Sequence, residues 1–268
     1  MNRISDDLYP MIFKRKSFHI FRDPPSGKAY HDDHHITDDE LEQIQEIYDS
    51  LTPLYPGIRT AMRIAENEET SCQRGQEKVL LLYSEEKANA LANIGYLGEQ
   101  LDLKLASMNI GTLWFGLNKR QMPDYEGLKY VIMIAIGKVP EKSFRKDMFK
   151  AKRKEVSEIW QGPLLEGVSD IVRFAPSACN SQPWKVIREG SHLDVFRYRN
   201  ERKIGVMPQE GLVRYNHIDT GIFLCFLELC LAHQGYSFER TLYDDIQDEV
   251  MNRIAGYELN GEDLSHTI

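Results

Sequence analysis

The sequence predicts an α+β protein in which two similar α/β lobes form a pseudo-dimer around buried central helices. Three observations lead to this prediction: the chain length, the composition, and an order of strands and helices that occurs twice. At 268 residues the chain exceeds a usual single domain but is too short for two large ones. Its 42% hydrophobic and 28% charged residues can form a core and a solvated surface. We expect the lobes to span residues 1–160 and 161–268.

The first half of the chain contains a capped helix, a buried strand, a long helix with one apolar stripe, and another strand. The capped helix begins with a Thr and has a Glu three residues later, which is the pattern of a capping box. A short continuous apolar run predicts each strand. The capped helix is expected to begin at Thr37, with Glu40 closing the capping box. The strands are expected over 79–83 and 130–136, and the long helix from about Lys87 to Asn109, with Gly111 as its end.

The second half repeats this order. A strand is expected over 193–196, and a helix from about His217 to His233 that ends at Gly235. Aligning Asn93 with His217 places Gly111 opposite Gly235 without a gap, so we infer an internal duplication.

The segment 221–227 is apolar nearly all round, which predicts a helix buried on every side. Glu228 and the short length of the run argue against a membrane span. We interpret this helix as the structural centre of the pseudo-dimer.

The charge of the chain excludes two classes of partner. A net charge of -8 and a pI near 5.6 disfavour binding to nucleic acid and to anionic membranes. The sequence also has no apolar segment of about 18 residues and no basic start followed by an apolar run. We therefore expect a cytoplasmic protein.

Neither the cysteines nor the histidines predict a metal site. The cysteines lack paired metal-ligand spacing and are too few for a disulfide framework, so we expect buried free thiols. The cluster of His and Asp at 31–35 follows Pro and Gly residues and is interpreted as a solvated loop. The four cysteines are Cys72, Cys179, Cys225 and Cys230.

A basic cluster lies near the start of the sequence. The three cations of 14–16 precede Ser17, and His19 and Arg22 follow. A guanidinium, further cations and a hydroxyl donor are the groups that bind a phosphate. The alternative interpretation is a solvated basic run near a terminus.

A second constellation is the ten-residue string Ala175–Trp184. Its Pro, Ser and Asn residues predict a tight turn. Asn180 and Gln182, two residues apart, can present amide groups to one edge of a ligand. Uncharged amides of this kind suit a heterocycle or a polyol better than a metal ion. The alternative is an ordinary loop before a strand.

These segments resemble the nitroreductase family of flavoproteins. Residues 15–19 resemble the family's opening Arg-Arg-Ser-x-Arg motif, and Ala175–Trp184 resembles its Ala-Pro-Ser-x-x-Asn-x-Gln-Pro-Trp string. Residues 109–116 are similar to its Gly-x-Gly-x-x-Trp-x-Gly stretch. Residues 136–140 with 152–154 are similar to its late strand and basic segment.

The resemblance implies an FMN site in which the first motif and the late basic segment bind the phosphate. The second motif and the backbone after the long helix face the ribityl chain and the flavin ring. His19 departs from the family's Arg, which weakens its expected phosphate contact. The implied cofactor-binding residues are Arg15, Lys16, Ser17, His19, Arg153 and Lys154 on the phosphate side, and Phe115, Gly116, Pro176, Ser177, Ala178, Asn180 and Gln182 on the ring side.

The order of the motifs implies fused copies. In the family the Asn-x-Gln-Pro-Trp string precedes the long helix, whereas here it follows it. Thr60 and Met62 stand where we expect the first-half partners of Asn180 and Gln182, so only one site is complete. We predict one FMN per chain, in a monomeric pseudo-dimer or a weak homo-oligomer.

The implied activity needs no catalytic side chain and no metal, because FMN carries the chemistry. The resemblance implies ping-pong hydride transfer from NAD(P)H through flavin N5 to a small-molecule acceptor such as a nitroaromatic or a quinone. A Rossmann fold is disfavoured, since Gly111 and Gly116 follow a helix rather than a strand. Two alternatives remain: an FMN storage or sensing protein without reductase activity, and a flavin-modifying or dehalogenating branch of the superfamily.

Overall fold

The computed structural model describes residues 4–198, 209–245 and 250–260. The chain divides into two compact units, Met1–Lys150 and Ala151–Ile268. The predicted lobe boundary after residue 160 falls inside strand β5 (Trp160–Gln161). This strand pairs with β6 (Trp184–Glu189), so it belongs to the sheet of the second unit.

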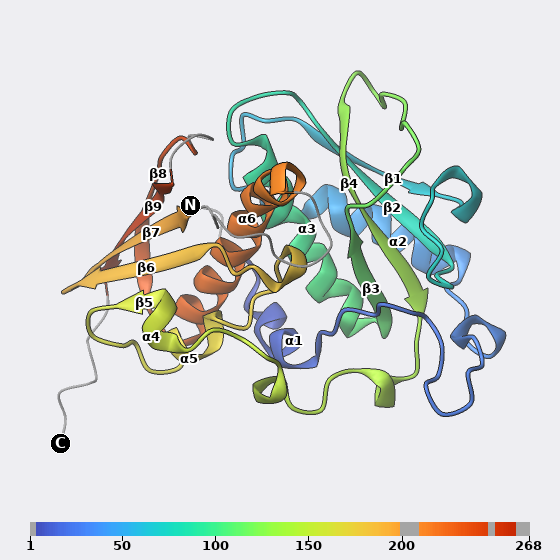
Figure 1. Cartoon of the computed structure of the whole chain (residues 1–268), viewed down its shortest axis with the longest axis horizontal. Helices are drawn as coiled ribbons and strands as arrows, with labels where there is room; N and C mark the ends of the chain where they lie inside the picture. Colours follow the sequence, from blue (N-terminus) through green and yellow to red (C-terminus); the bar gives the residue numbers. More distant parts are fainter. Residues whose placement is uncertain (1–3, 199–208, 246–249, 261–268) are drawn as a thin grey trace. The chain divides into compact units, whose positions relative to one another are not determined.

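The first unit contains a four-stranded antiparallel sheet with the order β1-β2-β4-β3. The two central strands are buried along nearly their whole length, as continuous apolar runs require. They confirm the strands predicted over 79–83 and 130–136. The strands are β1 (Thr60–Ala65), β2 (Lys78–Ser84), β3 (Ile110–Phe115) and β4 (Lys129–Lys138) (Figure 1).

Three α-helices accompany this sheet: α1 (Tyr9–Lys14), α2 (Asp38–Ser50) and α3 (Ala90–Ser107). The predicted capping box of α2 is confirmed. The Thr37 hydroxyl accepts the Glu40 N–H at 3.2 Å, and the Glu40 carboxylate accepts the Thr37 N–H at 3.1 Å. Short 3-10 turns occur at Asp6–Leu8, Tyr30–Asp32, Asn67–Glu69, Glu141–Ser143 and Met148–Lys150.

Gly111 does not end the long helix, so that prediction was wrong. Helix α3 ends at Ser107, and Asn109 takes the left-handed conformation with a φ of 58°. Gly111 lies within β3, where the ring of Phe18 packs against it. A Cβ at Gly111 would lie 2.7 Å from Phe18 Cδ2. This glycine therefore permits close packing rather than a turn.

The second unit contains a five-stranded sheet with the order β5-β6-β7-β9-β8. Only β5 is parallel to its neighbour. The further strands are β7 (His192–Tyr198), β8 (Ser237–Leu242) and β9 (Met251–Asn260), and the helices are α4 (Val156–Ile159), α5 (Ser169–Val172), α6 (Gln209–His233) and the 3-10 turn Ala178–Asn180.

Helix α6 begins earlier than predicted and ends at His233, as predicted. Gly235 follows it with a left-handed φ of 79°. Residues 216–231 are buried without exception, which confirms the prediction of a helix covered on all sides. In the described parts of the chain, no helix is long and apolar enough to cross a membrane.

The two units repeat one topology. Each has two antiparallel strands, a long helix and two further strands, and in each sheet the fourth of these strands lies between the second and the third. The register also shifts at one point in each central pair, between Leu82 and Tyr83 in β2 and between Val195 and Phe196 in β7. This repetition supports the inferred duplication.

Candidate functional site

Arg15, the predicted phosphate guanidinium, lies inside the first unit with only 3% of its surface exposed. Its Nε donates to Asp102 Oδ2 at 2.8 Å, and its Nη2 donates to Ser17 Oγ at 3.2 Å. Glu99 Oε1 lies 3.5 Å from the same Nε. The charge of Arg15 is therefore balanced by a carboxylate of α3.

Asp102 connects this arginine to β3. Its carboxylate also accepts the Thr112 hydroxyl at 2.5 Å and the Trp114 indole N–H at 3.1 Å. Glu99 lies one helical turn away and is fully buried, and neither of its carboxyl oxygens accepts a hydrogen bond from a described residue. Burial raises the pKa of Glu99 well above its ordinary value, which favours the protonated form of this carboxyl. Sequence reasoning missed both acids, although two carboxylates within an apolar stretch are an unusual pattern.

The two lysines that flank Arg15 in the sequence, Lys14 and Lys16, are half-buried, whereas Arg22 is exposed. Lys14 Nζ donates to Asn109 Oδ1 at 2.7 Å, and Lys16 Nζ donates to the Ser143 carbonyl at 3.0 Å. The Arg145 N–H donates to the Lys14 carbonyl at 3.1 Å. The segments 14–17 and 143–145 thus lie side by side. His19 is exposed.

This donor set fits a phosphate group. A phosphate dianion requires cations and a hydroxyl donor without a competing carboxylate. Among the described residues, no carboxylate forms an ion pair with Lys14, Lys16 or Arg145, and Ser17 supplies the hydroxyl.

Phe115 and Gly116, predicted to lie near a flavin ring, stand at the end of β3 and are half-buried. An isolated bridge between Ser17 and Thr112 joins the basic segment to the same strand. The basic segment therefore lies beside β3, the strand that contains most of the stretch after the long helix.

The predicted loop 175–184 in the second unit has a strained backbone. Three of its non-glycine residues take left-handed conformations, with φ values of 51° at Cys179, 55° at Asn180 and 47° at Gln182. Such conformations are costly and persist where surrounding contacts enforce them. Cys179 is exposed, so the prediction of a buried thiol was wrong for this residue, whereas the other three cysteines are buried as predicted.

Two polar side chains of α6 stabilise the conformation of this loop. Asp219 Oδ1 accepts the Ala178 N–H at 2.9 Å, and Asn216 Oδ1 accepts the Ser181 hydroxyl at 2.9 Å. Both α6 residues are buried. Burial raises the pKa of Asp219 well above its ordinary value. These anchors were not predicted, because only the fold brings α6 to the loop.

The two predicted amides differ in their surroundings. The Gln182 Oε1 accepts the Lys154 N–H at 2.8 Å, and its Nε2 donates to the Asn180 carbonyl at 3.2 Å. The Gln182 side chain is buried, whereas Asn180 is exposed. Gln182 therefore holds the loop together, and Asn180 is the amide that remains accessible. Pro176 is buried, and Ser177 and Ala178 are half-buried.

The predicted basic residues Arg153 and Lys154 lie against this loop. Lys154 Nζ donates to the Gln182 carbonyl at 2.9 Å and to the Tyr198 hydroxyl. Arg153 Nη2 donates to the Phe174 carbonyl at 3.3 Å. Burial lowers the pKa of Lys154. Both side chains brace the second unit around the loop.

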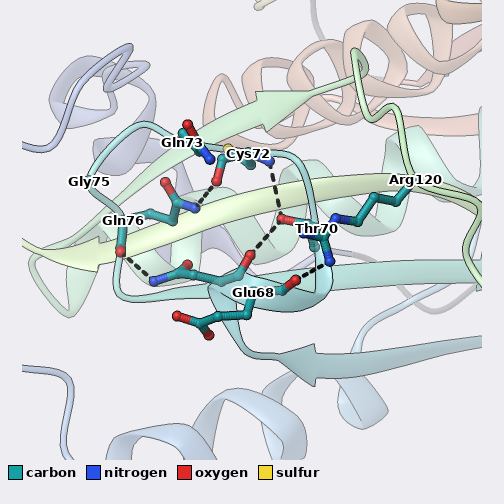
Figure 2. Close-up of a pocket in the computed structure, with 8 residues that line it drawn as sticks. Glu68, Thr70, Cys72, Gln73, Gly75, Gln76 and Arg120 are labelled. Carbon is teal, nitrogen blue, oxygen red and sulfur yellow. Dashed lines mark hydrogen bonds between the residues drawn. The ribbon is translucent and has the colours of Figure 1, made fainter.

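A polar pocket of about 320 Å³ lies in the first unit, and none of the predicted site residues lines it. Its polar groups bond to one another: Gln76 Nε2 donates to the Cys72 carbonyl at 2.7 Å, and Arg120 donates to the Glu68 carbonyl (Figure 2). These bonds brace a loop. No group of three metal-ligating side chains occurs within the described ranges.

Comparison with known proteins decides the family. A family model described as "Putative TM nitroreductase" matches residues 7–231, which is most of the chain. The chain belongs to this nitroreductase family. Among curated proteins, no sequence matches this nitroreductase-family chain significantly.

One solved structure has the same fold along nearly the whole chain. A Thermotoga maritima protein described as a nitroreductase is 18% identical, with a TM-score of 0.59 and 97% of each chain covered. This match confirms the nitroreductase-like α+β fold.

Two nitroreductases solved with bound FMN also match, with lower scores. The one from Desulfitobacterium hafniense is 15% identical over 58% of this chain and 100% of its own, with a TM-score of 0.39. The one from Bacteroides fragilis is 14% identical over 61% and 97%, with a TM-score of 0.37.

Proposed function

We propose that this nitroreductase-family chain is an FMN-dependent oxidoreductase that uses NAD(P)H to reduce nitroaromatic or quinone-like acceptors. The observation that supports the proposal is the cluster of Lys14, Lys16, Ser17 and Arg145, a phosphate donor set whose cations form no ion pair with a described carboxylate. Lys16 and Ser17 belong to the segment that resembles the family's phosphate motif.

The residues assigned to the cofactor fall into two sets. The basic segment and its hydroxyl would hold the phosphate. The end of β3 and the strained loop 175–184 would contact the ribityl chain and the ring. The loop is suited to this task because Asp219 and Asn216 fix it before any ligand arrives, which lowers the entropic cost of binding. The proposed residues are Arg15, Lys16, Ser17, His19, Arg153 and Lys154 for the phosphate, and Phe115, Gly116, Pro176, Ser177, Ala178, Asn180 and Gln182 for the remainder.

The side chains of this protein would bind and orient, and would supply neither a nucleophile nor a metal. Bound FMN supplies the redox chemistry, which is hydride transfer from NAD(P)H followed by reduction of an acceptor in a ping-pong scheme. The protein's contribution is to neutralise the phosphate charge and to fix the position of the cofactor.

Anaerobic reduction tests the proposal. The protein saturated with FMN is mixed with NADH or NADPH, and the visible flavin absorption is followed before and after a nitroaromatic or quinone is added. We expect absorption to be lost with the nucleotide and to return with the acceptor. Bound FMN that neither nucleotide reduces would favour a storage or sensing protein. No FMN binding at all would refute the proposal.

A further inference from the structure

Arg145 is a half-buried cation to which the described part of the chain provides no anion. Burial and the nearby charge of Arg15 lower the pKa of its guanidinium, and no carboxylate counteracts this. Among the described residues, no hydrogen bond or ion pair involves its side chain. Partial burial of a charge costs free energy, and an anion bound beside Arg145 would offset part of that cost.

The backbone places Arg145 beside the phosphate motif. Its N–H donates to the Lys14 carbonyl at 3.1 Å, and two residues earlier the Ser143 carbonyl accepts Lys16 Nζ at 3.0 Å. Lys14 Nζ also lies over the Phe144 ring, 4.9 Å from its centroid. The segment 143–145 is thereby held along the basic segment by a contact at each of its three residues.

The guanidinium of Arg15, in contrast to that of Arg145, already has an anionic partner within the chain. Its Nε already bonds to Asp102 at 2.8 Å, its charge is balanced, and its surface is 97% buried. Binding a phosphate with this guanidinium alone would place the dianion close to the Asp102 carboxylate. Repulsion between these anions would offset part of the gain.

We propose that Arg145 supplies the guanidinium that binds the phosphate of FMN, together with Lys14, Lys16 and Ser17. Arg15, assigned above to the phosphate by the family motif, instead positions Ser17 from within the core. This assignment rests on the proposed function for the identity of the ligand. The sequence resemblance assigned no role to Arg145. The chemistry recognised at this site is a phosphate monoester.

The experiment compares Arg145→Ala with Lys146→Ala, which removes the next, exposed cation. FMN and riboflavin are titrated separately by flavin fluorescence, and the midpoint of thermal unfolding is measured with and without inorganic phosphate. Arg145→Ala should weaken FMN binding by about 10- to 100-fold, the range for a charge-assisted bond, and leave riboflavin binding unchanged. Lys146→Ala should change neither. Unchanged riboflavin binding also shows that Arg145→Ala has folded, and Arg145→Gln provides a second variant.

The outcomes separate this inference from the proposed function. If Arg145→Ala binds FMN as tightly as the wild type, the inference is wrong and the proposed cofactor stands. If the wild type binds no flavin, the proposed function fails, and the phosphate measurement decides the inference. Stabilisation by phosphate that is lost in Arg145→Ala and kept in Lys146→Ala would then support an anion site. Stabilisation equal in both variants, or absent from the wild type, would overturn it.

Discussion

Burial determines what a charged residue can do in this protein. Arg15 belongs to a basic motif by sequence, yet the fold encloses it beside Asp102. Arg15→Met should leave this carboxylate buried without its cation and lower the free energy of unfolding by about 3–5 kcal/mol. Urea denaturation measures the change, with the half-buried Lys16→Met as control. A stable Arg15→Met variant that binds FMN weakly would instead make Arg15 a direct ligand.

Glu99 makes stability depend on pH in a predictable direction. Burial raises the pKa of its carboxyl in the folded state above the ordinary value of 4.5, so the folded protein keeps a proton that the unfolded chain releases. The stabilising contribution of Glu99 is complete below pH 4.5 and is lost as the pH rises toward the folded-state pKa. Relative to Glu99→Gln, the wild type should lose about 1.4 kcal/mol per pH unit in this window. Denaturation at several pH values tests this, and parallel curves for the two proteins would contradict it.

Asp219 helps to hold the loop 175–184 in its conformation. Asp219→Ala removes the acceptor of the Ala178 N–H and should speed amide exchange of residues 178–182 by about tenfold or more, since a lost buried hydrogen bond costs about 1–3 kcal/mol. Hydrogen exchange measures the effect. The matched control is Asp170→Ala, which removes an exposed carboxylate of the same unit. Equal exchange in both variants would show that the loop holds its conformation without α6.

At the scale of elements, features that depend on neighbouring residues could be predicted from the sequence, whereas contacts between distant parts of the chain could not. The capping box of Thr37 and Glu40 and the apolar runs of β2 and β4 depend on neighbouring residues, and the structure confirms them. The role of Gly111 depends on where the Phe18 ring packs, which periodicity does not reveal. The internal bonds of Gln182 likewise depend on Lys154, which lies 28 positions away. The motifs of the predicted site can therefore be recognised in the sequence, whereas the residues that hold their side chains in place become apparent only in the folded chain.

The packing of α3 against its sheet depends on Gly98. A Cβ at this position would lie 3.0 Å from Trp114 Cζ2 and 3.3 Å from Leu82 Cδ1. Gly98→Ala should therefore lower the free energy of unfolding by about 1–3 kcal/mol, the usual cost of overpacking. Gly57→Ala is the control, because a Cβ there meets nothing within 4 Å. Chemical denaturation of both variants measures the difference, and equal stability would show that Trp114 moves without cost.

At the scale of the whole molecule, one topology carries two different sets of side chains. Both units repeat the strand order and the position of the register shift. Thr60 and Met62 lie within β1, whereas Asn180 and Gln182 lie in the loop before β6. The predicted alignment of Thr60 and Met62 with Asn180 and Gln182 was therefore wrong. The segment of the first unit that corresponds to the loop before β6 is the one just before Thr60, where β1 begins. Duplication preserved the backbone arrangement while the side chains diverged.

This divergence predicts the binding stoichiometry. The cluster of Lys14, Lys16, Ser17 and Arg145 belongs to the first unit, and the segment 162–173 of the second unit contains no Arg-x-Ser motif. A phosphate needs several cations at once, so only the site that includes this cluster should hold it. Titration with FMN, monitored by absorption after removal of free flavin, should saturate at one equivalent per chain of 31.1 kDa. Saturation at two would mean that the second unit binds the phosphate with groups other than this motif. Selective loss of one of those two equivalents in Arg145→Ala would then locate the first.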